Sequence, residues 1–148
     1  MFEQDYIMRL IHQVIWAMFK LLFDIDIDAP GERLPVTRDR DKQTLDRLTA
    51  LVDAGRVGEA EDIVFEIADN ADAADIPLVL TFFLRLNDRT DAFLEEHGFT
   101  REELADDLNA ILRKYSLDGL AGMLAAVPPS NTEEPRNDNG SAARGREV

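Results

Sequence analysis

Three observations from the sequence predict an all-α fold, which we expect to be a single-domain bundle of six to seven helices. Apolar residues recur every three to four positions in several segments, which is the period of an amphipathic helix. Glycine, proline and capping residues separate these segments. No segment shows the alternation of a β-strand except residues 23–28, which are too few and too acidic to begin a sheet. We therefore expect a helical domain over residues 1–127, containing a tetratricopeptide-like helical hairpin, and a disordered polar tail over residues 128–148.

The first helix is predicted from Gln4 to Phe23 and has a wide apolar face. That face covers about half of the helix circumference, more than a helix lying on one surface normally needs. Either this helix is central in the core, or part of its surface contacts a partner. Trp16 lies on its polar side, and tryptophan is enriched at binding hot spots. The residues that we assign to a partner interface are Tyr6, Leu10, Val14, Trp16 and Met18.

An acidic connector follows the first helix. Asp24, Asp26 and Asp28 alternate with other residues in the segment FDIDIDAPGERL. This spacing is similar to the start of a calcium-binding loop, but such a loop needs glycine at its sixth position and an acidic residue at its twelfth. Ala29 and Pro35 stand at those positions. We interpret the segment as a connector that ends the helix, with loose divalent-metal binding as the alternative.

Two amphipathic segments on either side of Gly55 predict a helical hairpin. One helix is expected from about Arg38 to Ala54, and the next begins a few residues after Gly55. Gly55 stands where a helix C-terminus favours a left-handed residue, and Ala60 allows the two helices to approach closely. The hairpin over residues 45–69 resembles half of a tetratricopeptide-type pair, but no second copy follows at a fixed spacing. An ordinary hairpin within a bundle is the alternative.

The second half of the chain predicts further helices. Asp75 is expected to cap a nearly all-apolar helix over residues 77–86, which we place at the centre of the core. A short helix follows, and Thr100 with Glu103 has the capping-box spacing for the next helix. A last short helix is expected over about residues 117–127.

The composition favours a cytoplasmic protein and argues against two classes of partner. The chain has 30 acidic and 16 basic side chains, a formal net charge of −14. Such a surface repels phosphate backbones and anionic membranes, so we expect no nucleic-acid partner and no membrane partner. The apolar run near the N-terminus has an acidic start and lacks the small-residue cleavage site of a secretory signal. Charged and polar residues also interrupt it, which argues against a membrane-spanning helix.

The sequence contains no pattern of catalytic residues that we recognise, and we expect neither an enzyme nor a cofactor. The two histidines, His12 and His97, lack the glutamate three residues earlier that di-iron helical bundles use. Adjacent acids such as Glu61 and Asp62 point about 100° apart on a helix, so neighbours do not converge. The leading hypothesis is a protein–protein interaction or regulatory module that forms a homodimer. The alternative is a small-molecule or divalent-metal binder, with its site near the three aspartates or beside Arg85, the one charged residue of an otherwise apolar helix.

Four segments of the sequence carry a resemblance to a known family. They are MFEQDYIMRLI at residues 1–11, DAGRVGEAED at 53–62, FFLRLN at 82–87 and HGFTREEL at 97–104. In this order they are similar to an uncharacterised family of small bacterial proteins, a domain of unknown function. The resemblance spans about residues 1–120 and implies a bacterial source and an all-helical fold. It implies no activity, so it assigns no catalytic residues.

Overall fold

The structure, a computed structural model, describes residues 2–31, 36–117 and 119. These residues form six α-helices, one short 3₁₀-helix and no strand, which confirms the predicted all-helical class. The helix predicted over residues 117–127 and the tail predicted over 128–148 lie outside the described residues, apart from Leu117 and Gly119. The elements are α1 (Phe2–Phe23), α2 (Asp39–Asp53), α3 (Val57–Asp69), η1 (Ala73–Asp75), α4 (Ile76–Asn87), α5 (Asp91–Glu96) and α6 (Arg101–Lys114).

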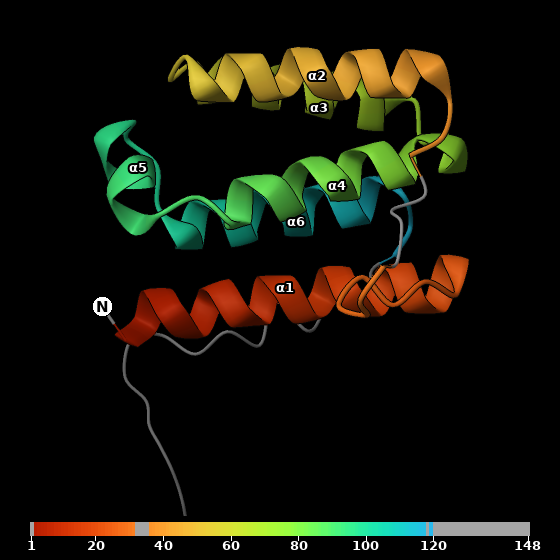
Figure 1. Ribbon diagram of the computed structural model, residues 1–148, viewed down its shortest axis with the longest axis horizontal. Coiled ribbons are helices and arrows are strands. Elements are labelled where there is room, and N and C mark those ends of the chain that lie inside the picture. The colour runs from red at the N-terminus through yellow and green to blue at the C-terminus, as the bar shows by residue number, and fades with distance from the viewer. Residues whose placement is uncertain (1, 32–35, 118, 120–148) are drawn as a thin grey trace, which may run out of the picture.

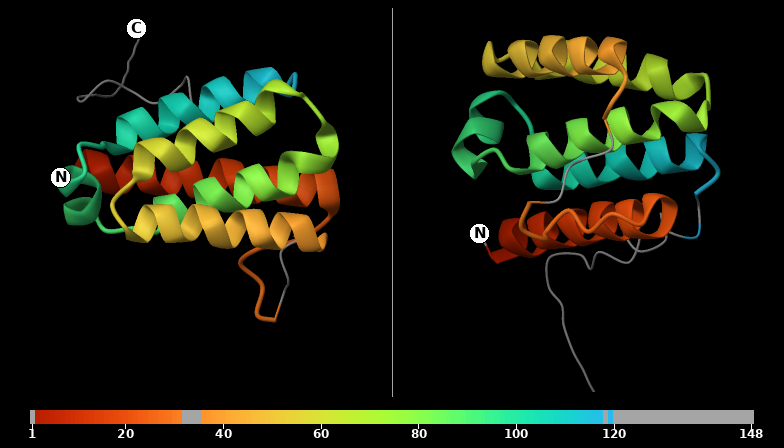
Figure 2. Two further views of the ribbon diagram at one scale, coloured as in Figure 1. Left: turned by 90° about the horizontal axis from the view of Figure 1, so that it is seen from above. Right: turned by 45° about the vertical axis from the view of Figure 1, so that its right-hand side comes forward.

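The helices form three layers (Figure 1). Helices α2 and α3 make the first layer, α4 and α6 the second, and α1 lies by itself in the third. The same stacking is visible from a second direction in the right-hand view of Figure 2. Helix α1 contacts both α4 and α6, while α4 also contacts α2 and α3. Because α1 is alone in its layer, only one of its sides faces the middle layer.

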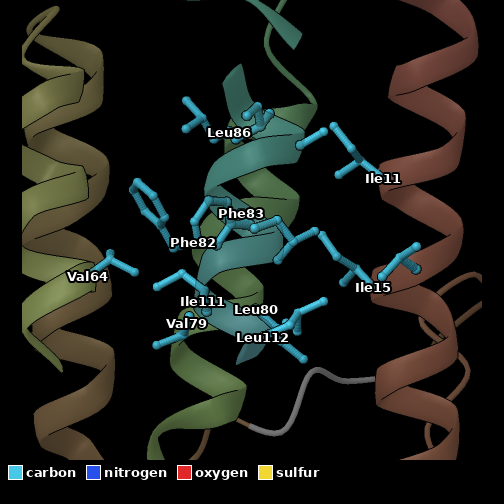
Figure 3. Packing of buried hydrophobic residues seen from close by; sticks show 14 of the residues in the cluster. Ile11, Ile15, Val64, Val79, Leu80, Phe82, Phe83, Leu86, Ile111 and Leu112 are labelled. Atoms are coloured by element: carbon cyan, nitrogen blue, oxygen red, sulfur yellow. The ribbon is translucent and has the colours of Figure 1, made fainter. Parts of the chain in front are cut away.

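Helix α4 lies at the centre of the core, as its apolar sequence predicts. Ten of its twelve residues are buried. Figure 3 shows its side chains between Val64 of α3 on one side and Ile11 and Ile15 of α1 on the other. Burying one Leu, Ile or Phe side chain contributes about 1.5–3 kcal/mol, so this shared cluster is the main source of stability for all three layers.

Two predicted helix ends are confirmed. Gly55 has φ +82°, the left-handed conformation expected after α2. At the start of α6, the hydroxyl of Thr100 accepts a hydrogen bond from the backbone N–H of Glu103 at 3.1 Å, and the Glu103 carboxylate accepts one from the backbone N–H of Thr100 at 2.9 Å. Both signals are local, which is why the sequence predicts them correctly.

Asp75 stands at the N-cap position of α4, as predicted, with Pro77 in the first turn, but the predicted capping by its side chain is wrong. The side chain makes no capping hydrogen bond, and its carboxylate instead accepts one from Nη2 of Arg38 at 2.8 Å. The 3₁₀ turn η1 comes directly before α4, so the capping side chain is that of Asp72, which accepts a hydrogen bond from the backbone N–H of Ala74 at 3.0 Å. Asp75 is part of that turn and has a helical backbone, so it does not have the extended conformation that a capping residue needs.

Arg101, the first residue of α6, is a buried cation with 1% exposure. Its guanidinium donates to the backbone carbonyls of Asn87 at 2.5 Å and Arg89 at 2.6 Å, and to the carboxylate of Asp91 at 3.1 and 3.2 Å. The side-chain amide of Asn87 in turn donates to the carbonyl of Met8 at 2.9 Å. One side chain therefore joins the start of α6 to the turn between α4 and α5 and, through Asn87, to α1.

The four segments that carry the family resemblance meet at this end of the molecule, where α5 and the N-terminus lie (Figure 1). Met8, Asn87 and Arg101 come from three of them and are joined by the hydrogen bonds described above. The fourth segment contributes Gly55, which lies against the ring of His97: a Cβ added at Gly55 would be 2.7 Å from Cε1 of that ring. These segments therefore contribute contacts that join α1, α4 and α6, and a contact between the α2–α3 turn and the C-terminal end of α5.

Candidate interaction surface on helix α1

The five predicted interface residues of α1 lie in three environments. Val14 and Met18 have 0% exposure and are part of the core cluster. Tyr6 is 43% exposed, whereas Leu10 and Trp16 are half-buried. Burial against helices of the same chain thus accounts for the inner part of the wide apolar face. The surface members of the predicted set are Tyr6, Leu10 and Trp16.

The acidic connector folds back along α1, and we call residues 24–31 the strap. The chain reverses at Asp24, which has φ 57° at the end of α1. Each of its three aspartates then contacts a residue of α1, and the contacts move back along the helix one turn at a time. The pairs are Asp24 with Nζ of Lys20 at 3.1 Å, Asp26 with Nε1 of Trp16 at 2.8 Å, and Asp28 with Nε2 of His12 at 2.7 Å.

The three partners on α1 have a regular spacing. Lys20, Trp16 and His12 are four residues apart, about one helical turn each, so they lie along one side of α1. The strap returns along this side and contains a turn, in which the backbone N–H of Ala29 donates to the carbonyl of Asp26 at 3.1 Å. The three aspartates that look like a metal loop in the sequence therefore contact three successive turns of α1.

The contacts of the strap bear on two functions considered for these residues. One is partner binding by Trp16, and the other is divalent-metal binding by the three aspartates. The indole N–H of Trp16 is bonded within the chain, and this hydrogen bond is the main reason that the pKa of Asp26 is lowered. Because the three aspartates contact three different partners, they do not converge on one point. Among the described residues, no group of three or more His, Asp or Glu side chains is placed to hold a metal ion.

The opposite flank of α1 is not covered by the strap. On this side, residues three or four positions apart form a stripe about 22 Å long, which we call the open flank. Leu21 at one end is 68% exposed and Tyr6 at the other is 43% exposed. The interface predicted from the sequence did not include Ala17 and Leu21. Counting three or four residues at a time along the helix from Tyr6 places both of them on the same side as Tyr6. The open flank consists of Tyr6, Leu10, Gln13, Ala17 and Leu21.

Helix α1 is also long and apolar enough to cross a membrane when judged by length and composition alone. The relevant segment is Gln4–Phe23, of which the apolar window is 33% buried inside the structure. The core helix of a soluble protein passes the same test.

A separate pair of carboxyl groups lies between α3 and α6. Burial, followed by the hydrogen bond with Asp107, raises the pKa of Glu61 to about 9, and the negative charges of Asp107, Asp62 and Glu103 act in the same direction. Atom Oε2 of Glu61 is buried, and no donor from the described residues reaches it. Glu61 is therefore protonated at neutral pH. Sequence reasoning considered only adjacent acids and missed this pair, which forms because α3 packs on α6.

Comparison with known proteins places the chain in a family but identifies no characterised relative. No curated protein and no solved structure matches it. One family model, that of DUF6483, matches residues 1–116, a range that includes all four of the resembling segments. The chain belongs to DUF6483, a family of unknown function.

Proposed function

We propose that this chain is a bacterial, cytoplasmic protein–protein interaction or regulatory module, not an enzyme, and that it forms a homodimer through the open flank of α1. The observation that carries the proposal is the distribution of exposed apolar side chains. Among the described residues, the exposed large hydrophobic side chains are Tyr6, Leu21 and Leu22, and all three lie on α1. Apolar surface gathered along one helix is typical of an association face.

The open flank suits a second copy in antiparallel orientation. In that arrangement Tyr6 lies opposite Leu21 of the second copy, and Leu10 lies opposite the smaller Ala17, so bulky and small side chains alternate across the seam. Gln13 falls near the two-fold axis, where a polar residue favours one register over others. A two-fold interface of this kind uses the same patch on both copies.

The proposal includes the finer organisation of the fold. Residues 1–127 are proposed to form one domain, and α2 with α3 a tetratricopeptide-like hairpin. The two helices run antiparallel (Figure 1), joined at Gly55, and Ala60 in their contact has 0% exposure. A small buried residue at that point supports the close helix approach that such a hairpin requires.

Light scattering coupled to size-exclusion chromatography tests the homodimer. The monomer mass is 16.7 kDa, and we expect wild-type protein at micromolar concentration to have twice that mass. Leu21→Asp is expected to shift the protein to monomer, since it places a charge in the apolar seam. Ala50→Asp is a matched control, because it adds the same charge at an exposed position near the C-terminal end of α2. A monomeric wild type, or a Leu21→Asp variant that dimerises as the control does, would contradict the proposed interface.

A further inference from the structure

Leu22 lies on the inner side of α1 but is not covered as its neighbours are. It follows Met18 by four residues and Phe19 by three, so the three side chains lie on the same side of the helix. Met18 and Phe19 have 0% exposure, whereas Leu22 is 41% exposed. The inner side of α1 therefore continues past the part of the core that covers it.

The helices that cover α1 are shorter than α1 itself. Helix α6 begins level with Gln4, whose side-chain oxygen accepts a hydrogen bond from the backbone N–H of Arg101 at 3.4 Å, and it runs in the same direction as α1 (Figure 1). Helix α4 runs in the opposite direction and ends level with Met8, whose carbonyl accepts from Asn87. At about 1.5 Å per residue, neither helix reaches beyond about the level of Phe19. The last turn of α1 extends past both.

The chain leaves α6 at the same end of the molecule as the last turn of α1 (Figure 1 and the right-hand view of Figure 2). Ser116 has φ 60° and turns the chain, and the backbone N–H of Leu117 donates to the carbonyl of Leu112 at 2.9 Å. Leu117 is partly buried and packs against the core cluster. The residues that follow Leu117 therefore start close to the last turn of α1.

The sequence of residues 117–127 has the composition of a segment that packs on apolar surface. Asp118 is its one charged residue, although 31% of the whole chain is charged. A helix of about three turns that contains Gly119 and Gly122 is not stable in water by itself, so it needs an apolar surface to pack on. The apolar side chains of the segment recur at helical spacing and are Leu117, Leu120, Met123, Leu124 and Val127.

We propose that residues 117–127 form a short helix that docks on the C-terminal end of α1, with Leu120 and Leu124 against Leu22. This segment is the occupant because it starts beside the exposed leucine and has an apolar face along its whole length. Docking at Leu22 leaves the open flank free, since Leu22 and Leu21 point about 100° apart on the helix. The inference extends the proposed domain of residues 1–127 and does not depend on the homodimer.

Paramagnetic relaxation measured by NMR on the full-length protein tests the contact. The chain has no cysteine, so Ala125→Cys gives one attachment site for a nitroxide label, on the side of the proposed helix away from Leu120 and Leu124. The label is expected to broaden the backbone amide signals of residues 20–23 and to leave those of residues 53–58, at the other end of the molecule, unchanged. A mixture of isotope-labelled wild type with nitroxide-labelled protein is expected to show no such broadening, because the contact is within one chain.

Two variants and a matched control measure the effect on stability. Leu22→Asp and Leu124→Asp are each expected to lower the Tm by roughly 4–10 °C. The double variant is expected to lower it by little more than either single change, because both break the same contact. Ala125→Asp adds the same charge on the outer side of the proposed helix and is expected to change the Tm by less than about 2 °C.

Three results would overturn the proposal. The label broadens no signal from residues 20–23, or the broadening arises only between molecules and a second copy is the occupant, or Leu22→Asp and Leu124→Asp behave as Ala125→Asp does. Light scattering on the same variants reports the homodimer separately. A monomeric mass with the broadening retained would contradict the homodimer and support the docked segment.

Discussion

Glu61 provides a direct prediction about pH and stability. In the folded protein its pKa is raised to about 9, mainly by burial and by the hydrogen bond with Asp107, whereas the ordinary value of a glutamate is 4.5. Below the ordinary value both the folded and unfolded chains hold the proton. As the pH rises from about 4.5 to 9, the unfolded chain releases the proton and the folded chain keeps it. This residue therefore lowers the free energy of unfolding progressively across that range and has its full destabilising effect above the folded pKa.

The change Glu61→Gln removes this titration. Glutamine has no proton to lose, and its amide N–H donates to Asp107 as the protonated acid does. Full linkage would make the stability difference between variant and wild type grow by about 1.4 kcal/mol per pH unit. Solvent reaches part of Glu61 and reduces the effect, so between pH 5.5 and pH 7.5 we expect the variant to gain about 1–2 kcal/mol relative to wild type.

Urea denaturation followed by circular dichroism at a series of pH values measures the difference. The control is Glu66→Gln, an exposed position on the same helix, which is expected to show no pH-dependent gain. A stability difference for Glu61→Gln that is flat from pH 5 to pH 8, or that shrinks as the pH rises, would refute the assignment of a protonated Glu61.

Two further predictions concern the end of the molecule where the resembling segments meet, and both are measured by the same denaturation assay at pH 7. Arg101→Met keeps much of the side-chain volume but leaves two backbone carbonyls and Asp91 without their donor. We therefore expect the free energy of unfolding to fall by about 3–5 kcal/mol. A fall below about 1 kcal/mol would show that the buried guanidinium is not needed for stability. Gly55→Ala places a residue with a Cβ at φ +82° and brings that Cβ against the ring of His97. We therefore expect the free energy of unfolding to fall by about 1–3 kcal/mol. Stability equal to wild type would mean that the turn relaxes without cost.

Much of the helical architecture is predictable from local sequence. The Thr100–Glu103 box and the left-handed Gly55 involve residues within a few positions of one another, so their geometry follows from the backbone they occupy. The nearly all-apolar sequence of α4 likewise predicts a central helix, because such a segment is stable only when it is covered on several sides.

The roles of the charged and interface residues depend on contacts between distant segments. The sequence alone does not show that Asp75 accepts from Arg38, 37 residues away, that Glu61 meets Asp107, or that Arg101 joins three helices. The same is true of the first helix, where the sequence predicts a surplus of apolar surface but not which side is covered. Packing against α4 and α6 buries Val14 and Met18, the strap engages Trp16, and the open flank remains. Helix periodicity and capping are set by neighbours in the chain, whereas burial and ion pairing are set by whichever elements the tertiary fold brings together.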